Sequence, residues 1–356
     1  MSGLCGRVVF CRHGESIWNK APVRFTGWAN VPLTENGRLQ ARETGNTLKM
    51  FSLTPDVAFT SLLRRSRESL DEIQKADVNY KSITVINSWR LNERHYGALV
   101  GLSKEDATAS MGQELVTEWR KSWAVAPPPL IKEDLYAYKE APWAQPYTII
   151  NKPGGESYTV KEEGSEMPLT ESLRDCCNRV LPLWKEAIQP RLLRGETVLV
   201  VAHANSIRAI VKHIDNVSDE NVRKINIPSA IPLVYDFAAV QAPAPGPGPT
   251  GSSGLSEVRP VGEPNAYGTR GRYVASKQLM YALRAGLSGP PRDNENDESF
   301  LSLLGDSVVA SLSLDPRSHV DARGGVVVGG SKRAAVVREH FAKTVFGEVE
   351  SHEGER

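Results

Sequence analysis

Short apolar runs alternate with amphipathic helical patterns along the chain up to residue 237, and this alternation constrains the fold most. The runs that predict buried strands are 8–11, 57–59, 83–85, 197–202 and 233–237. Strands separated by helices usually pair in parallel, because the crossover helix carries the chain back to the same end of the sheet. We therefore predict an α/β fold with three layers, in which a mostly parallel, doubly wound sheet has helices on both faces.

The helices between these strands are predicted from capping residues and apolar stripes. Thr34 and Thr170 are the expected N-caps of two helices, because a hydroxyl there accepts hydrogen bonds from free backbone N–H groups. Two further helices are expected between residues 103 and 123, and another starts near Ile207. The segment 62–67 places three arginines at the start of a helix, after the strand at 57–59.

Two of the predicted strands end in a histidine. The run 8–11 leads into Arg12 and His13, and the run 197–202 leads into His203. Ligands of open α/β sheets bind outside the carboxyl ends of the strands, so these side chains are expected at one binding edge. Either histidine alone would more often be a structural residue. The matched pair favours phosphoryl transfer, in which one imidazole is the nucleophile and the other stabilises the developing charge.

The overall charge excludes one broad class of binding protein. With 43 Lys and Arg against 42 Asp and Glu, the formal net charge is +1, which argues against a generally basic nucleic-acid binder. An anion site must therefore come from local clustering of cations. No apolar run approaches the ~20 residues that span a bilayer, and the N-terminus lacks the apolar stretch of a signal peptide, so no membrane association is expected. The four cysteines have no metal-site or disulfide spacing and predict reduced thiols in a cytoplasmic protein.

The composition divides the chain into four segments. Residues 1–237 are the predicted catalytic domain, with a long loop at 136–166 over the edge of the site. Residues 238–258 are rich in Pro, Gly and Ser and are expected to be an insertion or a linker. Residues 259–288 are expected to return to the catalytic domain with an edge strand and a short helix. Residues 289–356 are a tail of unknown role that is expected to be partly disordered.

Several motifs resemble one known family. The segments 11–16 (Cys-Arg-His-Gly-Glu-Ser) and 201–203 (Val-Ala-His) resemble the histidine phosphatase superfamily. Four other segments narrow the resemblance to the cofactor-dependent phosphoglycerate mutases: Phe-Thr-Gly-Trp at 25–28, Leu-Asn-Glu-Arg-His-Tyr-Gly-Ala-Leu at 91–99, Pro-Leu-Thr-Glu-Ser-Leu at 168–173 and Asn-Ile-Pro at 226–228. The resemblance covers about residues 6–237, and less clearly 259–286. It implies a phosphoglycerate mutase-like sheet, which agrees with the alternation of strands and helices.

The resemblance also implies roles for individual residues. His13 matches the nucleophile that becomes a phosphohistidine, and Glu93 matches the group that donates and accepts the proton. Arg12, Arg65 and His203 match residues that hold the transferred phosphoryl group. Without the resemblance, Glu93 and the arginine that follows it would be interpreted as an exposed ion pair. The other matches are to substrate-binding positions: Asn19, Thr26, Gly27, Arg94, Tyr96, Lys104, Arg120, Lys121, Ala204 and Asn205.

The implied reaction interconverts 3-phosphoglycerate and 2-phosphoglycerate, in glycolysis and gluconeogenesis. In this family 2,3-bisphosphoglycerate primes the histidine, no metal is needed, and the enzyme is a homo-oligomer, either a dimer or a tetramer. Two alternatives stay open. One is a bisphosphoglycerate mutase or phosphatase of the same superfamily, and the other is an inactive scaffold that binds phosphorylated partners. The joint presence of His13, Glu93 and His203 argues against the scaffold, because a binding module has no use for a proton-transfer group.

Two positions depart from the family pattern. Family members usually carry Arg where Lys121 stands and Gly where Ala204 stands. Lys121 keeps the charge but lacks the bidentate fork of Arg. Ala204 adds a methyl group where a backbone amide is expected to approach phosphate, which is harmless only if its φ is negative. We expect both departures to adjust binding without abolishing activity.

Overall fold

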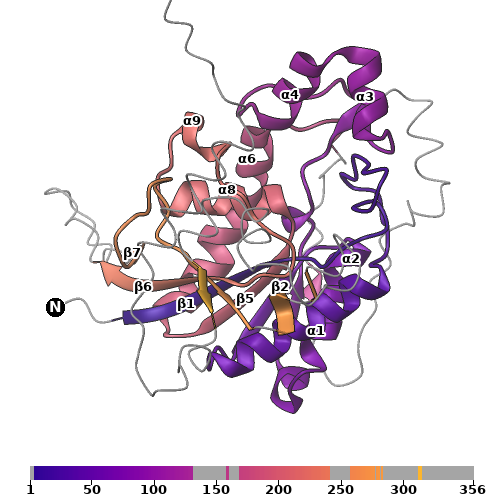
Figure 1. The fold of residues 1–356 in the computed structure, drawn as a ribbon. Coiled ribbons are helices and arrows are strands. Elements are labelled where there is room, and N and C mark those ends of the chain that lie inside the picture. The colour runs from indigo at the N-terminus through magenta and orange to yellow at the C-terminus, as the bar shows by residue number, and fades with distance from the viewer. Residues whose placement is uncertain are drawn as a thin grey trace, which may run out of the picture.

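The central feature of the structure is a mixed nine-stranded sheet (Figure 1). The computed structural model describes residues 4–130, 158–159, 168–240, 257–276, 278–280, 282–283 and 312–314. The strand order is β4-β3-β2-β5-β1-β6-β8-β9, and β7 pairs with β6. The strands are β1 (Leu4–Arg12), β2 (Val57–Thr60), β3 (Thr84–Asn87), β4 (Tyr158–Thr159), β5 (Thr197–Ala202), β6 (Leu233–Val240), β7 (Glu257–Pro260), β8 (Arg272–Ala275) and β9 (Leu312–Leu314).

Most neighbouring strands are parallel. The pairs β4–β3, β3–β2, β2–β5 and β5–β1 are all parallel, and so is β8–β9. β6 is antiparallel to β1, β7 and β8. The predicted α/β fold with a mostly parallel sheet is therefore confirmed.

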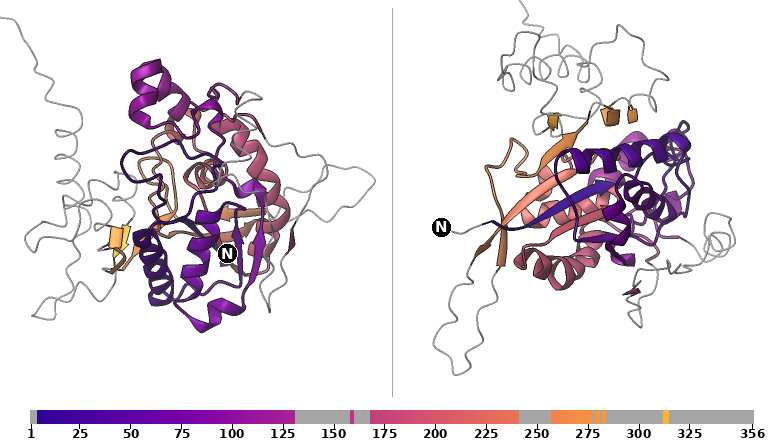
Figure 2. Two further views of the ribbon diagram at one scale, coloured as in Figure 1. Left: turned by 90° about the vertical axis from the view of Figure 1, so that its right-hand side faces the viewer. Right: turned by 90° about the horizontal axis from the view of Figure 1, so that it is seen from below.

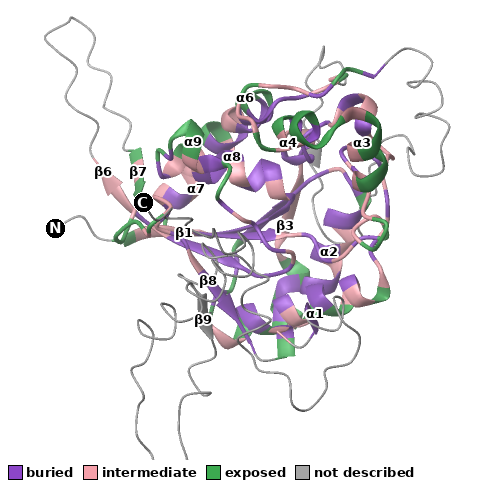
Figure 3. Cartoon of the chain, turned by 45° about the horizontal axis from the view of Figure 1, so that its top comes forward, coloured by how far each residue is buried: buried purple, intermediate pink, exposed green. Residues whose placement is uncertain are grey.

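Helices cover both faces of this sheet, as two further views show (Figure 2). α1 and α2 pack on one face, and α6 and α8 pack together on the other. Exposed residues lie mainly on the outer surfaces of the helices, whereas the central strands are buried (Figure 3). The helices are α1 (Glu35–Met50), α2 (Arg64–Gln74), α3 (Lys104–Met111), α4 (Gln113–Lys121), α6 (Leu173–Leu183), α7 (Gln189–Leu193), α8 (Ala204–Ile214) and α9 (Asp219–Val222).

β1 shows why a central strand has a continuous apolar run. Successive side chains of a strand point to opposite faces. Val8 and Phe10 join the core under α6 and α8, while Val9 and Cys11 join the core under α1 and α2. All four are at most 2% exposed. A strand covered by helices on both faces therefore has no polar side, which is why its sequence does not alternate.

The register of β1 and β5 brings the two histidines to one edge of the sheet. Arg12 pairs with Ala202 at the carboxyl ends of these parallel strands. His13 and His203 are the next residues on the two strands and therefore lie side by side. The predicted common edge is confirmed.

Two helix starts differ from the sequence prediction. α6 begins at Leu173, with Ser172 rather than Thr170 as its N-cap. Ser172 forms a reciprocal capping box with Asp175, whereas the Thr170 hydroxyl donates to the Pro127 carbonyl at 2.7 Å. α8 begins at Ala204 rather than near residue 207, because the extended backbone ends at His203 and the helix follows at once. Thr34 caps α1 as predicted.

The C-terminal part of the sheet extends further than predicted. β6 continues to Val240. The edge strand predicted within residues 259–288 is β8, which lies between β6 and β9 and is therefore not at an edge. β9 comes from the segment 289–356, for which no strand was predicted. Residues 278–280 and 282–283 are helical, within the helix predicted after β8. The loop predicted at 136–166, apart from β4, and most of 238–258 and 289–356 lie outside the described residues.

The tail is expected to be dispensable for catalysis. Ending the chain after Gly289 removes β9 but keeps every described residue that lines the cavity introduced below, the last of which is Asn226. We predict that kcat and KM stay within a few-fold of the wild-type values, measured by steady-state kinetics. Solubility should fall, because the edge of β8 becomes unpaired. A large loss of activity in a folded truncated protein would show that the tail helps to form the site.

The described residues also bear on the thiol and membrane predictions. All four cysteines are free thiols, and burial raises the pKa of Cys11 to about 12. Such a thiol is protonated and poorly reactive at neutral pH. Within the described parts of the chain, no helix has both the length and the apolarity needed to cross a bilayer.

Candidate active site

The site lies at the carboxyl ends of β1, β2 and β5, where two imidazole rings face each other. The ring centroids of His13 and His203 are 5.0 Å apart. Both side chains are buried. His203 also contacts Ser61, which follows β2, through a 2.7 Å hydrogen bond between its Nε2 and the Ser61 hydroxyl. Three strands therefore deliver polar groups to the same place.

The hydrogen bonds of His13 define its chemical state. Its Nδ1 lies 2.7 Å from the Gly14 carbonyl oxygen, which can only accept, so Nδ1 carries the proton. Arg65 Nε donates to His13 Nε2 at 3.1 Å, so Nε2 carries a lone pair. Burial and the nearby Arg65 and Arg12 guanidinium groups hold the pKa of His13 well below its ordinary value. His13 is thus a neutral imidazole with Nε2 as its potential nucleophilic atom.

Gly14 allows the tight packing that holds this turn. A Cβ on Gly14 would lie 2.2 Å from the carbonyl oxygen of Gly37, in the first turn of α1. Any larger residue would push α1 away from the turn. The Thr34 hydroxyl, which caps α1, also donates to the Glu15 carboxylate at 2.6 Å. Helix α1 therefore fixes the turn that presents His13.

Two arginines place buried positive charge beside His13. Arg65 is 1% exposed, and its NH1 and NH2 groups donate to the carbonyl oxygens of Ala29 and Gly27, both at 2.9 Å. Arg12 NH1 donates to the Ile227 carbonyl at 3.0 Å, whereas its buried Nε has no hydrogen-bond partner among the described residues. Burial lowers the pKa of the Arg12 guanidinium. Buried charge and an unused donor both favour an anion at this place.

His203 is also held neutral. Burial is the main cause of its lowered pKa, and the neighbouring Arg65 and His13 add to the effect. Its ring faces His13, and Ser61 fixes its orientation. An anionic phosphoryl group between the two rings would reverse the electrostatic penalty and favour protonation of His203. His203 is then suited to stabilise negative charge on the transferred group.

Glu93 is positioned by two backbone N–H groups. Its Oε1 accepts from Arg94 N at 2.8 Å and from Asn205 N, in the first turn of α8, at 3.2 Å. The helix N-terminus therefore points one of its free N–H groups at the carboxylate. Because both bonds fall on Oε1, Oε2 is the oxygen left to exchange a proton with a ligand. Glu93 is 8% exposed and lines the cavity beside His13.

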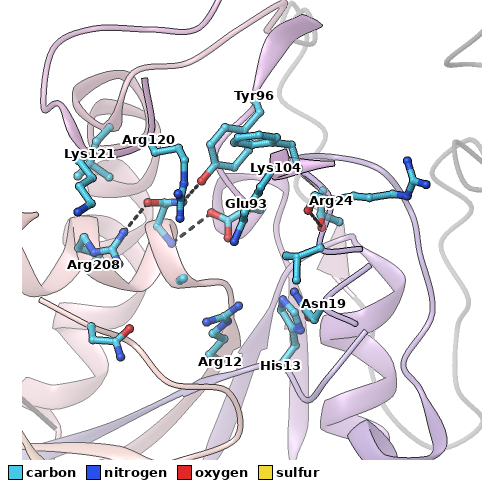
Figure 4. Close-up of a pocket in the computed structure, with 18 of the residues that line it drawn as sticks. Arg12, His13, Asn19, Arg24, Glu93, Tyr96, Lys104, Arg120, Lys121 and Arg208 are labelled. Carbon is cyan, nitrogen blue, oxygen red and sulfur yellow. Dashed lines mark hydrogen bonds between the residues drawn. The ribbon is translucent and has the colours of Figure 1, made fainter. Parts of the chain in front are cut away.

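These residues surround a cavity of about 390 Å³. Figure 4 shows His13 and Arg12 at its base, Glu93 above them, and Arg120, Lys121 and Arg208 on one side. Thirteen of the predicted site residues line it: Arg12, His13, Asn19, Thr26, Gly27, Arg65, Glu93, Tyr96, Lys104, Arg120, Lys121, Ala204 and Asn205.

Two predicted site residues do not line the cavity. His203 lies behind its wall, beside His13. Arg94 is fully buried, and its guanidinium lies 4.6 Å from the centre of the Tyr96 ring. Arg94 NH2 donates to the Arg120 carbonyl at 3.1 Å. In this structure Arg94 supports two cavity residues, and its contact with substrate stays a prediction.

Several lining residues were not predicted, and Arg208 is the best connected of them. Arg208 lies three positions after Asn205 on α8, so the two side chains share one face of the helix. Arg208 NH1 donates to Asn205 Oδ1 at 2.6 Å, and Asn205 Nδ2 donates to the Tyr96 hydroxyl at 3.1 Å. The i, i+3 spacing is the sequence signal for Arg208. The other missed polar residues are Arg24, Arg223, Lys224 and Asn226.

The charge of the cavity is strongly positive. Among the described residues that line it, nine are Arg or Lys and one, Glu93, is a carboxylate. Burial and the nearby Arg120 and Arg12 lower the pKa of Lys104 to about 8. Such clustering of like charge costs free energy unless an anion binds, so the cavity suits a small ligand with several negative charges.

The two departures from the family pattern are compatible with this site. Ala204 is the first residue of α8 and has helical backbone geometry rather than a positive φ. Its methyl group therefore causes no backbone strain. Lys121 ends α4 and lines the cavity next to Arg120.

A buried histidine two residues after Glu93 should make stability depend on pH. His95 is fully buried, and burial together with Arg179 lowers its pKa to about 4. In the unfolded chain a histidine titrates near pH ~6.5, so the unfolded state takes up the proton first as the pH falls. We predict that this group removes up to about 1.4 kcal/mol of unfolding free energy per pH unit between about pH 6.5 and 4, measured by urea denaturation.

The variant His95→Gln, which cannot be protonated, is the control for this prediction. Its unfolding free energy should fall less steeply with decreasing pH than that of the wild type. An unchanged slope would assign the pH dependence to other groups, such as His13 and His203.

Sequence comparison places the chain in a known family. The model of the histidine phosphatase superfamily (branch 1) matches residues 8–141 and 145–239. The chain belongs to the histidine phosphatase superfamily. It is therefore an enzyme, and the matched region contains both His13 and His203. A 2,3-bisphosphoglycerate-dependent phosphoglycerate mutase of Hamiltonella defensa is 43% identical over 231 residues, which are 65% of this chain and 86% of the relative.

The solved structures that resemble this chain are less similar to it in sequence than the relative above. The mycobacterial glucosyl-3-phosphoglycerate phosphatase is 20% identical, with a TM-score of 0.47 over 65% of this chain and 90% of that chain. The structure called mycobacterial hydrolase 2 is also 20% identical, with a TM-score of 0.49 over 80% of this chain and 98% of that chain.

Proposed function

We propose that the protein interconverts 3-phosphoglycerate and 2-phosphoglycerate through a phosphohistidine on His13. The main support for this proposal is that a neutral His13, the Glu93 carboxylate and nine Arg or Lys side chains line one cavity. The substrate is taken from the relative, which is named a 2,3-bisphosphoglycerate-dependent phosphoglycerate mutase. A cavity that stabilises several negative charges suits a ligand with a carboxylate and one or two phosphates.

In the first half of the reaction His13 Nε2 attacks one phosphorus atom of 2,3-bisphosphoglycerate, and a monophosphoglycerate leaves. The bond between phosphorus and the leaving oxygen breaks, and Glu93 gives its proton to that oxygen. Arg12 and Arg65 hold the equatorial oxygens, where negative charge is concentrated in phosphoryl transfer, and His203 beside His13 stabilises that charge. The Nδ1–H bond to the Gly14 carbonyl stabilises the positive charge that His13 acquires.

In the second half the phosphoryl group passes from His13 to the free hydroxyl of a bound monophosphoglycerate, which regenerates 2,3-bisphosphoglycerate. Glu93 takes the proton from that hydroxyl, so the enzyme returns to its starting state. When 3-phosphoglycerate is the acceptor and 2-phosphoglycerate is the species released in the first half, the two halves together interconvert the isomers. Tyr96, Asn205 and the cations at Lys104, Arg120 and Lys121 would hold the carboxylate and the second phosphate. This donor set fits 2,3-bisphosphoglycerate, which supplies the first phosphoryl group. The charge is neutralised by Arg and His side chains, so the proposal needs no metal.

The proposal includes the cellular setting implied by the family resemblance. The enzyme would act in the cytoplasm, in glycolysis and gluconeogenesis, as a homo-oligomer. A phosphatase would use the same His13 and Glu93 but would pass the phosphoryl group to water, so product analysis separates the two activities.

The test is to incubate the protein with 3-phosphoglycerate and a trace of 2,3-bisphosphoglycerate and to follow the products by ³¹P NMR. We expect 2-phosphoglycerate as the main product and little inorganic phosphate. Mainly inorganic phosphate would make the protein a phosphatase. No turnover of either kind would refute the enzymatic proposal.

A further inference from the structure

A buried ion pair lies directly behind the segment that carries Glu93. The side chains of Glu171 and Arg179 are 4% and 5% exposed. Arg179 Nε and NH2 donate to the two Glu171 carboxylate oxygens at 2.6 and 2.9 Å. Neither residue is among the described residues that line the cavity. The pair therefore does not meet a ligand there, and the mechanism above assigns it no role.

Arg179 is bonded to the turn that precedes and includes Glu93. This turn follows β3 and contains the short helix η2 (Trp89–Leu91). Arg90 NH1 donates back to the Arg179 carbonyl at 2.9 Å. The Arg179 guanidinium donates at 2.7–3.3 Å to four carbonyl oxygens of the turn, those of Trp89, Arg90, Asn92 and Glu93. A rigid planar fork bonded on every side fixes these carbonyls in one arrangement.

Glu171 holds the chain on the other side of Glu93. Its Oε2 accepts from His95 N at 2.8 Å, and its own N–H donates to the His95 carbonyl at 2.9 Å. The indole N–H of Trp28 donates to the Glu93 carbonyl. The backbone of Glu93 is thus held before, at and after this residue, although Glu93 lies in no regular helix or strand.

We propose that Glu171 and Arg179 are positioning residues for Glu93. They hold its backbone so that the carboxylate stays within reach of the proton that it transfers. This inference rests on the acid–base role proposed for Glu93. A displacement of about 1 Å in a reacting group can cost roughly 10²-fold in rate, so the pair has a large effect on catalysis without touching substrate.

The test uses Arg179→Lys, which keeps the charge and removes the fork. We expect phosphoglycerate turnover to fall by about 10- to 100-fold, by analogy with a misplaced reacting group. KM should change little, because the cavity cations are not altered. Phosphorylation of His13 by p-nitrophenyl phosphate should stay near the wild-type rate, because nitrophenolate leaves without a proton. Labelling by 2,3-bisphosphoglycerate, whose alkoxide must be protonated, should slow.

The ratio given by the labelling rate with 2,3-bisphosphoglycerate divided by the rate with p-nitrophenyl phosphate distinguishes a misplaced Glu93 from a disturbed fold. A disturbed fold would lower both rates alike. The double variant Glu93→Gln/Arg179→Lys should be no slower than Glu93→Gln alone, because the pair acts through that carboxylate. The control is Arg270→Lys, in an ion pair with Asp215 at 3.2 Å that is partly exposed and whose residues do not line the cavity. It should lower stability and leave the ratio unchanged.

Glu171→Gln gives a second route if Arg179→Lys does not fold, since it keeps an acceptor for His95 N. The ratio should fall in this variant too. The inference would be overturned if the variants that fold were labelled more slowly by both phosphoryl donors to the same extent. If the wild type is labelled by glycerol 3-phosphate but not by 2,3-bisphosphoglycerate, the mutase proposal fails alone, and the ratio is then measured with glycerol 3-phosphate. A wild type that no donor labels would refute the proposed function and the inference with it.

Discussion

His13→Ala should carry no acid-labile phosphate after incubation with 2,3-bisphosphoglycerate, and its turnover should fall roughly 10⁵-fold or more, the scale for loss of a covalent nucleophile. The reason is the state of the ring. Its Nδ1–H is bonded to the Gly14 carbonyl, and its Nε2 carries the lone pair at the base of the cavity. The lowered pKa keeps that lone pair free at neutral pH. Intact-protein mass spectrometry would measure the phosphoryl group directly.

Two other histidine variants complete this experiment. His203→Ala should still be labelled, but more slowly, because His203 stabilises charge and forms no covalent bond. His213→Ala, on the exposed side of α8, should behave like the wild type. Labelling that survives in His13→Ala and disappears only in His203→Ala would reverse the two roles. Circular dichroism of each variant would show that the fold is retained.

The sequence predicts the sheet well because its central strands are buried on both faces. Apolar runs such as 8–11 and 197–202 are typical of strands that helices cover on both faces. The order of strands in space was not predictable in the same way. β5 lies between β1 and β2, although it follows β2 by well over a hundred residues. The adjacency of His13 and His203 was therefore predicted only because each follows an apolar run. The register of β1 and β5 establishes it.

Local signals explain the errors in helix starts. Thr170 and Ser172 both carry a hydroxyl, and the sequence prediction chose the first. The deciding residue is Asp175, three positions after Ser172, which completes a capping box. That spacing is visible in the sequence, so the correct start was predictable. β9 had no comparable signal, because a three-residue strand is too short to show periodicity.

The cavity wall was only partly predictable. Residues on the motif segments were found, whereas Arg223 and Lys224, which follow α9 and belong to no predicted motif, also line the cavity. The Glu171–Arg179 pair was missed for a different reason. Charged residues are usually exposed, and nothing in the sequence shows that these two are buried against the turn of Glu93.

Glu93→Gln should fold and bind phosphoglycerate but lose roughly 10²- to 10⁴-fold in turnover, the range for a positioned proton-transfer group. The glutamine amide oxygen can still accept from Arg94 N and Asn205 N, the two bonds that now hold Oε1. The cations that line the cavity are unchanged, so KM should change little. Steady-state kinetics in both directions and urea denaturation would measure these effects.

Comparing two phosphoryl donors shows whether Glu93→Gln is defective in proton transfer alone. Glu93→Gln should be labelled by p-nitrophenyl phosphate at nearly the wild-type rate, because His13, Arg12 and Arg65 are intact and nitrophenolate needs no proton. Labelling by 2,3-bisphosphoglycerate should be slow, because its alkoxide leaves unprotonated. Near-normal turnover of Glu93→Gln would mean that another group moves the proton. The first candidate would then be the Tyr96 hydroxyl, which also lines the cavity and is held by Asn205 Nδ2.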